Sequence, residues 1–238
     1  MVDDEGKSLP ALVEEIEGDL FDAPEGAVLI RTLAHIVAIT AYQGLIDACN
    51  CQGSWGKGIA KAFKEKYPAA FEVYRSHCRR LLSSPEYTAI PNLTVMSNEP
   101  PNAGHTDSRR LQLPEGTTLL IPPQKGDYTL DSKNSTQKPM KHWIACLFTS
   151  RHYGRKVSTP NDILFNTEHA VEDLKRQLSE WDIGGTETTT QDGFKCRPGD
   201  LWSCRFNSGL FAVEWEKSLQ ILRKSGLKVT VVRPKGQE

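Results

Sequence analysis

The sequence lacks an excess of charge of either sign. Its 29 Lys and Arg residues oppose 30 Asp and Glu residues, so the formal net charge of the 238-residue chain is −1. Proteins that bind nucleic acid or an anionic membrane through their overall field need a broad basic surface. We therefore expect neither nucleic acid nor a membrane as a partner.

A long apolar run is also missing. The most apolar stretch, 27–41, contains Arg31 and His35. It falls short of the roughly 20 apolar residues that a membrane-spanning helix needs. The N-terminal stretch "MVDDEGKSLP" is acidic and polar, unlike a signal peptide. Both observations predict a cytoplasmic and/or nuclear protein.

The cysteines show no pattern of a disulfide framework or a metal site. Six of them are scattered over a chain much longer than small disulfide-stapled domains. No Cys-x-x-Cys and no His-x-His spacing occurs, so a zinc site could form only by long-range assembly. We expect no metal and no cofactor.

Short apolar runs alternate along the chain with segments of helical periodicity. The runs predict strands at 11–17, 44–50, 117–123, 142–150 and 227–233. Apolar residues three or four apart predict helices near 59–67 and 71–81, a helix that opens at Pro160 with a stripe through Trp181, and one at 214–224. This alternation is typical of an α/β fold, whose mostly parallel sheet is covered by helices on both faces.

The chain is expected to form a single domain from 11 to 234. Stretches rich in Pro, Asn, Ser and Gly predict surface loops between the elements. Inserted loops are expected near 30–44, 83–116 and 182–199, with a further loop at 126–140. Residues 1–10 and 235–238 are expected to be flexible termini.

A glycine-rich turn, "CNCQGSWGKGIA" at 49–60, follows one predicted strand and opens a helix. Glycines let backbone N–H groups approach a ligand, and a helix N-terminus favours phosphate. The turn matches neither Walker A nor the dinucleotide fingerprint, so an ordinary tight turn is the alternative. Asn50 could bond a sugar hydroxyl or shape the turn. Trp55 could pack on a ligand or on the core.

A second glycine turn, at 208–209, also falls after a predicted strand. In α/β folds, ligands bind outside the carboxyl ends of the parallel strands. Two such turns facing one another could share a single diphosphate. Ser208 does not stand in the nucleophile motif Gly-x-Ser-x-Gly, and we interpret it as a phosphate contact.

Four segments together resemble one family. Asp19-Leu20, "NCQGSWGKGIA", "CLFTSRHYG" and "NSGLFAVEWEK" are similar to the macrodomains of the ADP-ribose 1''-phosphate phosphatase type, over a span from about Glu15 to Val232. The resemblance implies a macrodomain-like three-layer α/β/α sandwich with a mixed, mostly parallel central sheet. It also implies a monomer that binds small-molecule ADP-ribose derivatives.

The resemblance also assigns ligand contacts. It implies that Asp19 accepts a hydrogen bond from the adenine amino group, with Leu20 beside it, and that Asn50 holds the distal ribose. Phe211 would flank that ribose. The distal ribose and pyrophosphate would be wrapped by Gly53, Ser54, Trp55, Gly56, Gly58 and Ile59. Backbone N–H groups would reach the phosphates from Asn207, Ser208, Gly209 and Leu210.

The implied reaction is hydrolysis of the phosphomonoester of ADP-ribose 1''-phosphate, a by-product of tRNA splicing, without a metal. Asp47 would act as the base and Asn50 would orient the sugar. Phosphatases of this type usually carry His at the position of Asp47, and His suits acid–base work near neutral pH better than Asp. His152 is another acid–base candidate, although an exposed loop histidine is the simpler interpretation.

Two alternatives stay open. One is a module that binds ADP-ribose without turnover. The other is an ADP-ribosyl-protein hydrolase, which in a related branch uses Lys and Asp. Those positions correspond here to Ser150 and Phe211, neither of which can supply an amine or move a proton.

The segment from Arg31 to Gly44 resembles an insertion, because in relatives the preceding apolar run leads almost directly into the Asn50 motif. One hypothesis is an unspliced intron in a predicted gene, which transcript sequencing would test.

Overall fold

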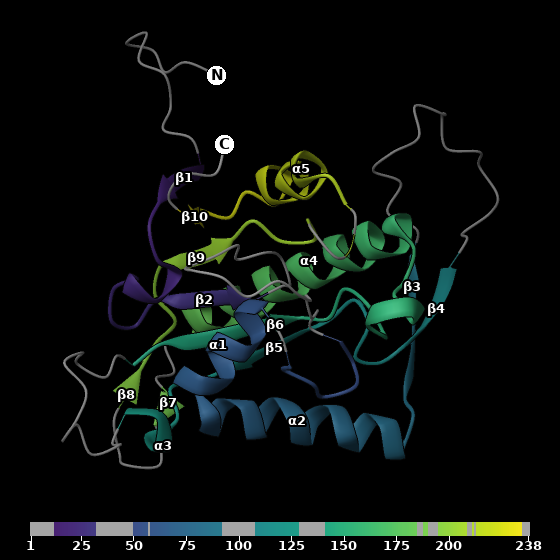
Figure 1. Cartoon of the computed structure of the whole chain (residues 1–238), viewed down its shortest axis with the longest axis horizontal. Coiled ribbons are helices and arrows are strands. Elements are labelled where there is room, and N and C mark those ends of the chain that lie inside the picture. Colours follow the sequence, from purple (N-terminus) through teal and green to yellow (C-terminus); the bar gives the residue numbers. More distant parts are fainter. Residues whose placement is uncertain are drawn as a thin grey trace, which may run out of the picture.

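The structure, a computed structural model, describes most of the chain (Figure 1). The described residues are 12–31, 50–56, 58–91, 108–128, 141–184, 188–189, 195–208, 211 and 213–234. Several sequence predictions lie outside them: the two termini, most of the 30–44 stretch, and the strand at 44–50 except for its last residue, Asn50. The single domain from 11 to 234 stays a prediction.

A six-stranded sheet forms the centre of the fold. Its strand order is β1-β10-β9-β2-β6-β5. The strands are β1 (Val13–Glu17), β2 (Val28–Arg31), β5 (Thr118–Ile121), β6 (Trp143–Leu147), β9 (Leu201–Cys204) and β10 (Val229–Arg233). All neighbours pair in parallel except β5, which runs antiparallel to β6. The predicted mixed, mostly parallel sheet is confirmed.

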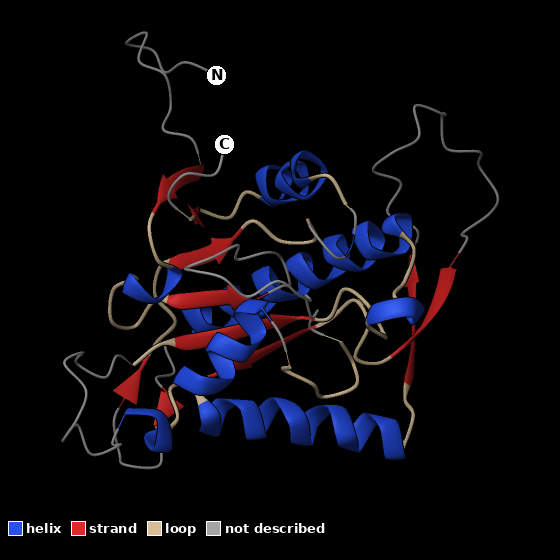
Figure 2. Cartoon of the chain, in the orientation of Figure 1, coloured by secondary structure: helices blue, strands red, loops and turns tan. Residues whose placement is uncertain are grey.

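Helices cover both faces of this sheet (Figures 1 and 2). They are α1 (Gly58–Lys66) and α2 (Pro68–Ser83) on one face, and α4 (Pro160–Gly184) and α5 (Trp215–Ser225) on the other. Alternate residues of β6 divide between the two cores: Ile144 packs with α1 and α2, whereas Ala145 packs with α4 and α5. All five residues of β6 are buried, as expected for a strand covered on both sides. The result is a three-layer α/β/α sandwich.

The helix boundaries follow the predicted signals. Pro68 interrupts the helical pattern after α1, and the structure places it in the first turn of α2, three residues before the predicted start at Phe71. The carboxylate of Asp127, in the short helix α3 (Lys125–Tyr128), accepts hydrogen bonds from the amides of Ala69 and Ala70. A residue far along the chain thus caps the N-terminus of α2. Gly226 adopts φ 73° and ends α5.

The loop predictions were wrong in part. Within 83–116, β3 (Tyr87–Pro91) and β4 (Ser108–Gln112) form an antiparallel ribbon beside the main sheet. Within 182–199, β7 (Thr188–Thr189) and β8 (Lys195–Cys196) form a shorter one, and α3 overlaps the loop expected at 126–140. The first ribbon is attached to α4 by an ion pair between Arg109 and Asp162, a contact that loop composition cannot reveal.

A buried hydrogen-bond chain ties the joint between α1 and α2 to the sheet. The Nε2 of His142 lies 2.9 Å from the carbonyl oxygen of Ala23, so Nε2 carries the proton. The hydroxyl of Tyr67 therefore donates to His142 Nδ1, over 2.6 Å. Both side chains are almost fully buried. Burial raises the pKa of Tyr67 far above its ordinary value and lowers the pKa of His142.

In the described part of the chain, we find no helix with the length and apolar character needed to cross a membrane.

Replacing Tyr67 with Phe should destabilise the fold. Tyr67→Phe leaves the buried Nδ1 of His142 without its donor, at a cost of about 1–3 kcal/mol. The matched control is Tyr87→Phe, because Tyr87 is 51% exposed and its loss of a hydroxyl should cost less than about 0.5 kcal/mol. Urea unfolding measures both. Equal losses in the two variants would contradict a structural role for the Tyr67–His142 bond.

Acid should weaken the fold through its buried histidines. Burial lowers the pKa of His142 and of His169, so both stay neutral in the folded protein while unfolded histidines bind protons below about pH 6.5. Their contribution is therefore fully present above that pH and is lost as the pH falls toward the lowered folded values. Urea unfolding at about pH 7.5 and 5.5 should show this loss. His169→Phe should reduce it, and an unchanged loss would contradict the assignment.

Candidate functional site

The carboxyl ends of the parallel strands carry four of the predicted site residues. Asp19 and Leu20 follow β1, and Asn207 and Ser208 follow β9. Thr149 and Ser150 follow β6. Parallel strands present these ends at one edge of the sheet, which is where α/β proteins bind ligands.

Asn50 shapes the first turn. Its Oδ1 accepts a hydrogen bond from the amide of Gln52, 2.8 Å away, and its Nδ2 donates to the carbonyl of Ser54 over 3.2 Å. The hydroxyl of Tyr74, on α2, donates to the Asn50 carbonyl. Asn50 is fully buried, so the turn-forming alternative describes its side chain in this structure. Its contact with a sugar stays a prediction.

Gly53 and Trp55 have structural reasons for their identity. Gly53 has φ 71°, and a Cβ there would lie 3.3 Å from Cys78 Cβ and 3.5 Å from the Arg75 carbonyl oxygen. Only glycine therefore allows the turn to approach α2 so closely. The ring of Trp55 stacks on Tyr74 with centroids 5.0 Å apart, and its side chain is 2% exposed. Its packing on the core is the alternative that this structure favours over a ligand contact.

Asn207 anchors the second turn. It is buried and, within the described residues, it is the one non-glycine position with positive φ, at 61°. Its Nδ2 donates to the hydroxyls of Thr167 and Ser218, on α4 and α5. Its Oδ1 accepts from the hydroxyl of Thr149 over 3.3 Å. The side-chain amide of Asn207 thus makes its hydrogen bonds with other groups of the protein.

The two turns flank the same pair of residues. Asn50 forms a parallel β-bridge with Ser150, and Asn207 bonds its neighbour Thr149. The side chain of Gln52 also donates to the carbonyl of Arg151, over 3.1 Å. Residues from widely separated parts of the sequence are therefore held side by side around the segment that follows β6.

The residues predicted to lie near the adenine are found elsewhere along the edge. Asp19 is exposed, and its Oδ1 accepts from the amide of Phe21, capping a short 3-10 helix at Leu20–Asp22. Strand β10 separates β1 from β9, so Asp19 does not adjoin the Asn207 turn directly in the sheet. Leu20, Ile59 and Phe211 are buried in one apolar cluster on the α1 face.

Some predicted site residues lie outside the described residues. They are Asp47, Gly209 and Leu210. Gly58 is the first residue of α1, Gly56 is exposed, and Ser54 and Ser208 are half-buried. The ligand contacts assigned to all of these positions stay predictions.

Positive charge is not supplied by the described side chains of the two turns. Residues 50–56, 207–208 and 211 include no Lys or Arg. The nearby guanidinium of Arg151 pairs with Glu115 at 2.9 Å and donates to the carbonyl of Gln112. Backbone N–H groups at such turns are donors that an anion can use. The part of the chain described here contains no cluster of three or more metal-ligating side chains.

The sequence prediction missed three residues of this site: Thr149, Thr167 and Ser218. Thr149 was predicted to continue a strand that in fact ends at Leu147. Thr167 and Ser218 are fully buried polar residues on helices whose other buried residues are mostly apolar. That mismatch is the signal that could have found them, because a buried hydroxyl needs a partner.

Comparison with known proteins identifies the family. No family model matches the chain. An ADP-ribose 1''-phosphate phosphatase of Aspergillus fumigatus is 52% identical over 229 residues, covering 96% of this chain and 98% of the relative. One from Neosartorya fischeri gives the same figures, and one from Ajellomyces capsulatus is 39% identical over 95% of this chain and 98% of the relative. The chain belongs to the ADP-ribose 1''-phosphate phosphatase family.

Solved structures support the fold assigned to this phosphatase-family chain. The macrodomain of Mycobacterium tuberculosis DarG has a TM-score of 0.53 at 17% identity, covering 94% of this chain and 98% of that one. Thermosipho africanus DarTG in complex with ADP-ribose has a TM-score of 0.52 at 15% identity, over 95% of this chain and 42% of that one. These likenesses show that the family member has the macrodomain fold, as the sequence resemblance implied.

The close approach of Gly53 to α2 predicts a measurable cost for a side chain there. Gly53→Ala should destabilise the protein by more than Gly154→Ala. Both glycines have similar positive φ, 71° and 64°, which costs alanine about 1–2 kcal/mol, but a Cβ at Gly154 would meet nothing within 4 Å. Urea unfolding of the two variants isolates the steric part. An equal loss of stability in the two variants would show that α2 can move away from the new Cβ at position 53 at no cost in free energy.

Proposed function

We propose that this protein hydrolyses the phosphomonoester of ADP-ribose 1''-phosphate, releasing ADP-ribose and phosphate. The observation that carries the proposal is the joining of the Asn50 and Asn207 turns to Ser150 and Thr149, next to one another. Membership of the phosphatase family, at 52% identity over nearly the whole chain, supplies the substrate.

Backbone groups would do most of the binding. The left-handed φ of Asn207 turns the chain so that the following amides can converge on phosphate oxygens. Backbone donors that are fixed before a ligand arrives can stabilise developing charge on a phosphoryl group without reorganising. The exposed carboxylate of Asp19 suits the adenine amino group, since one of its oxygens already caps the 3-10 helix and the side chain remains accessible.

Asp47 is our candidate for the base that activates water. It precedes Asn50 by three positions in the sequence. An ordinary Asp has a pKa of about 3.9 and is an anion near neutral pH, where it can accept a proton but also repels phosphate. The backbone N–H groups of the turns would offset that repulsion.

The two alternative functions differ in the residues that they require. A module that only binds ADP-ribose needs the two turns but no base, so a measurement of phosphate release distinguishes it from the phosphatase. The ADP-ribosyl-protein hydrolase is disfavoured, since the Ser150 hydroxyl bonds the His152 carbonyl over 2.8 Å and Phe211 is 3% exposed. Neither side chain can act as nucleophile or proton carrier there.

The substrate, as a by-product of tRNA splicing, fits a cytoplasmic and/or nuclear monomer that acts on a small molecule rather than on nucleic acid. The net charge of −1 supports the absence of a nucleic-acid surface.

Two measurements on the full chain test the function. The wild type should bind ADP-ribose in calorimetry and release phosphate from ADP-ribose 1''-phosphate. Asp47→Ala should keep its ADP-ribose affinity within about threefold and lose phosphate release by roughly 100-fold, as expected for removal of a general base. The exposed Asp200 provides the control Asp200→Ala, which should change neither.

Each other outcome has a distinct meaning. Binding without release by the wild type would leave the binding module. Unchanged release in Asp47→Ala would exclude Asp47 as the base. Failure of the wild type to bind ADP-ribose would remove the proposed ligand class.

A further inference from the structure

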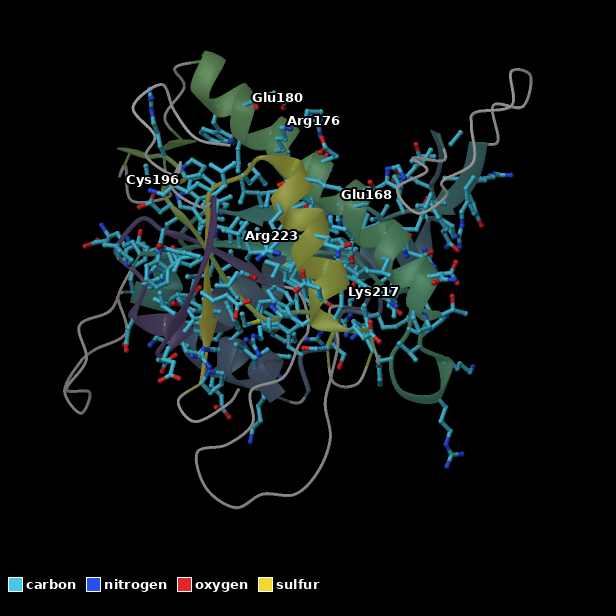
Figure 3. All side chains as sticks on the ribbon, turned by 90° about the horizontal axis from the view of Figure 1, so that it is seen from above. Glu168, Arg176, Glu180, Cys196, Lys217 and Arg223 are labelled. Carbon is cyan, nitrogen blue, oxygen red and sulfur yellow. The ribbon has the colours of Figure 1, made fainter. Side chains whose placement is uncertain are left out.

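A cluster of uncharged polar side chains lies buried beneath the Asn207 turn. Its members come from the end of β6, from α4, from the turn itself and from α5, and each is at most 1% exposed: Thr149, Asn166, Thr167, Asn207 and Ser218. Figure 3 shows α4 and α5 lying side by side, with Glu168 and Lys217, the sequence neighbours of Thr167 and Ser218, labelled on them. Polar groups so deeply buried are costly unless their hydrogen bonds are made.

Asn207 is the centre of this cluster. A primary amide has two N–H hydrogens, and Nδ2 of Asn207 places them on Thr167 Oγ1 at 2.7 Å and Ser218 Oγ at 3.3 Å. Both donors are used within the protein. The side chain of Asn207 therefore has no N–H left for a ligand, and its contribution to a phosphate site must come through its backbone.

The backbone at Asn207 is held in an unusual conformation. Its φ of 61° is left-handed, which most residues avoid but which Asn tolerates better than others. The carbonyl oxygen of Asn207 accepts from the amide of Val213, over 3.1 Å, which closes the turn. Such conformations persist where the surroundings determine them, and they occur often at functional sites.

Thr167 has a fixed role in the cluster. Its hydroxyl donates to the carbonyl of Ile163, one turn earlier in α4, over 2.7 Å. With its only hydrogen spent there, the oxygen of Thr167 faces Asn207 as an acceptor. Ser218, on α5, accepts the other hydrogen of the same amide. A residue from each of the two helices therefore accepts a hydrogen bond from the Asn207 side chain.

We propose that Thr167 and Ser218 are positioning residues of the phosphate site. By accepting both N–H groups of Asn207, they fix the left-handed conformation from which the turn presents backbone amides to the ligand. This inference rests on the proposed function and extends it. The ADP-ribose site is set from behind by α4 and α5, through residues that do not touch the ligand.

The test removes the acceptor while keeping the shape. Thr167→Val is isosteric but cannot accept a hydrogen bond, so one N–H of Asn207 loses its partner. We expect ADP-ribose affinity, measured by calorimetry on the full chain, to fall about tenfold. Thr167→Ser retains the hydroxyl and should restore affinity to within about twofold of the wild type.

Thr118→Val is the matched control. The Thr118 hydroxyl is also buried, 7% exposed, and also donates to α4, at the carbonyl of Ala170 over 2.6 Å, but it belongs to β5 rather than to the Asn207 cluster. Both valine variants should lower the urea midpoint by similar amounts, whereas only Thr167→Val should weaken ADP-ribose binding. Equal affinities in the two variants would overturn the proposal.

Hydrogen exchange separates this proposal from the proposed function. In the ligand-free protein, backbone amides of the peptide containing 207–213 should exchange faster in Thr167→Val than in the wild type or in Thr118→Val. Unchanged exchange would overturn the positioning role even if ADP-ribose binds. If the wild type fails to bind ADP-ribose, the proposed function and the ligand role of the turn fail together. Faster exchange confined to Thr167→Val would still show that Thr167 stabilises the conformation of Asn207.

Discussion

The burial of β6 on both faces is the constraint on which the arrangement of the site depends. A strand with no solvent-facing side must be covered by α1 and α2 on one face and by α4 and α5 on the other. One residue beyond its end, after Phe148, Thr149 and Ser150 are also fully buried, but they are polar. Their hydrogen-bonding groups must be satisfied inside the protein, and the chain meets this need with segments from distant parts of the sequence.

That need brings the two turns together. Ser150 pairs with Asn50, and the hydroxyl of Thr149 donates to Asn207. Both asparagines, the most suggestive side chains in the sequence, spend hydrogen bonds on protein groups. We propose that an anionic ligand is bound mainly by backbone amides, whose direction depends on φ and ψ and not on the identity of a side chain.

The family and the fold rest on different kinds of likeness. Relatives 52% identical over nearly the full chain place the protein among the ADP-ribose 1''-phosphate phosphatases. Solved macrodomains at 11–17% identity share the architecture alone. Neither likeness tests the expectation, drawn from the resemblance, that a His stands in phosphatases of this type where this sequence has Asp47.

The amino-acid sequence by itself indicated the strands β1, β5, β6 and β10 and the helices α1, α2, α4 and α5, in their order along the chain, but not the central strands β2 and β9. Apolar periodicity, the helix-starting prolines Pro68 and Pro160 and the stop at Gly226 are local signals, and each was found where local physics places it. The sequence prediction failed where a strand depends on a distant partner. Tyr87–Pro91 was predicted to be part of a loop, because its partner strand begins only at Ser108, beyond a polar stretch. Strand pairing across such a gap is a tertiary event.

Only the tertiary structure decided what the site residues do. The partners of Asn207 lie 40 and 58 positions away in the sequence, at Thr167 and Thr149, and no local pattern announces such bonds. Gly53 was predicted from the sequence to let the backbone approach a ligand, and only the folded structure shows that α2 also approaches it closely, at Cys78. The physical reason is the same in both cases: burial and hydrogen-bond satisfaction are properties of groups that meet only after the chain has folded.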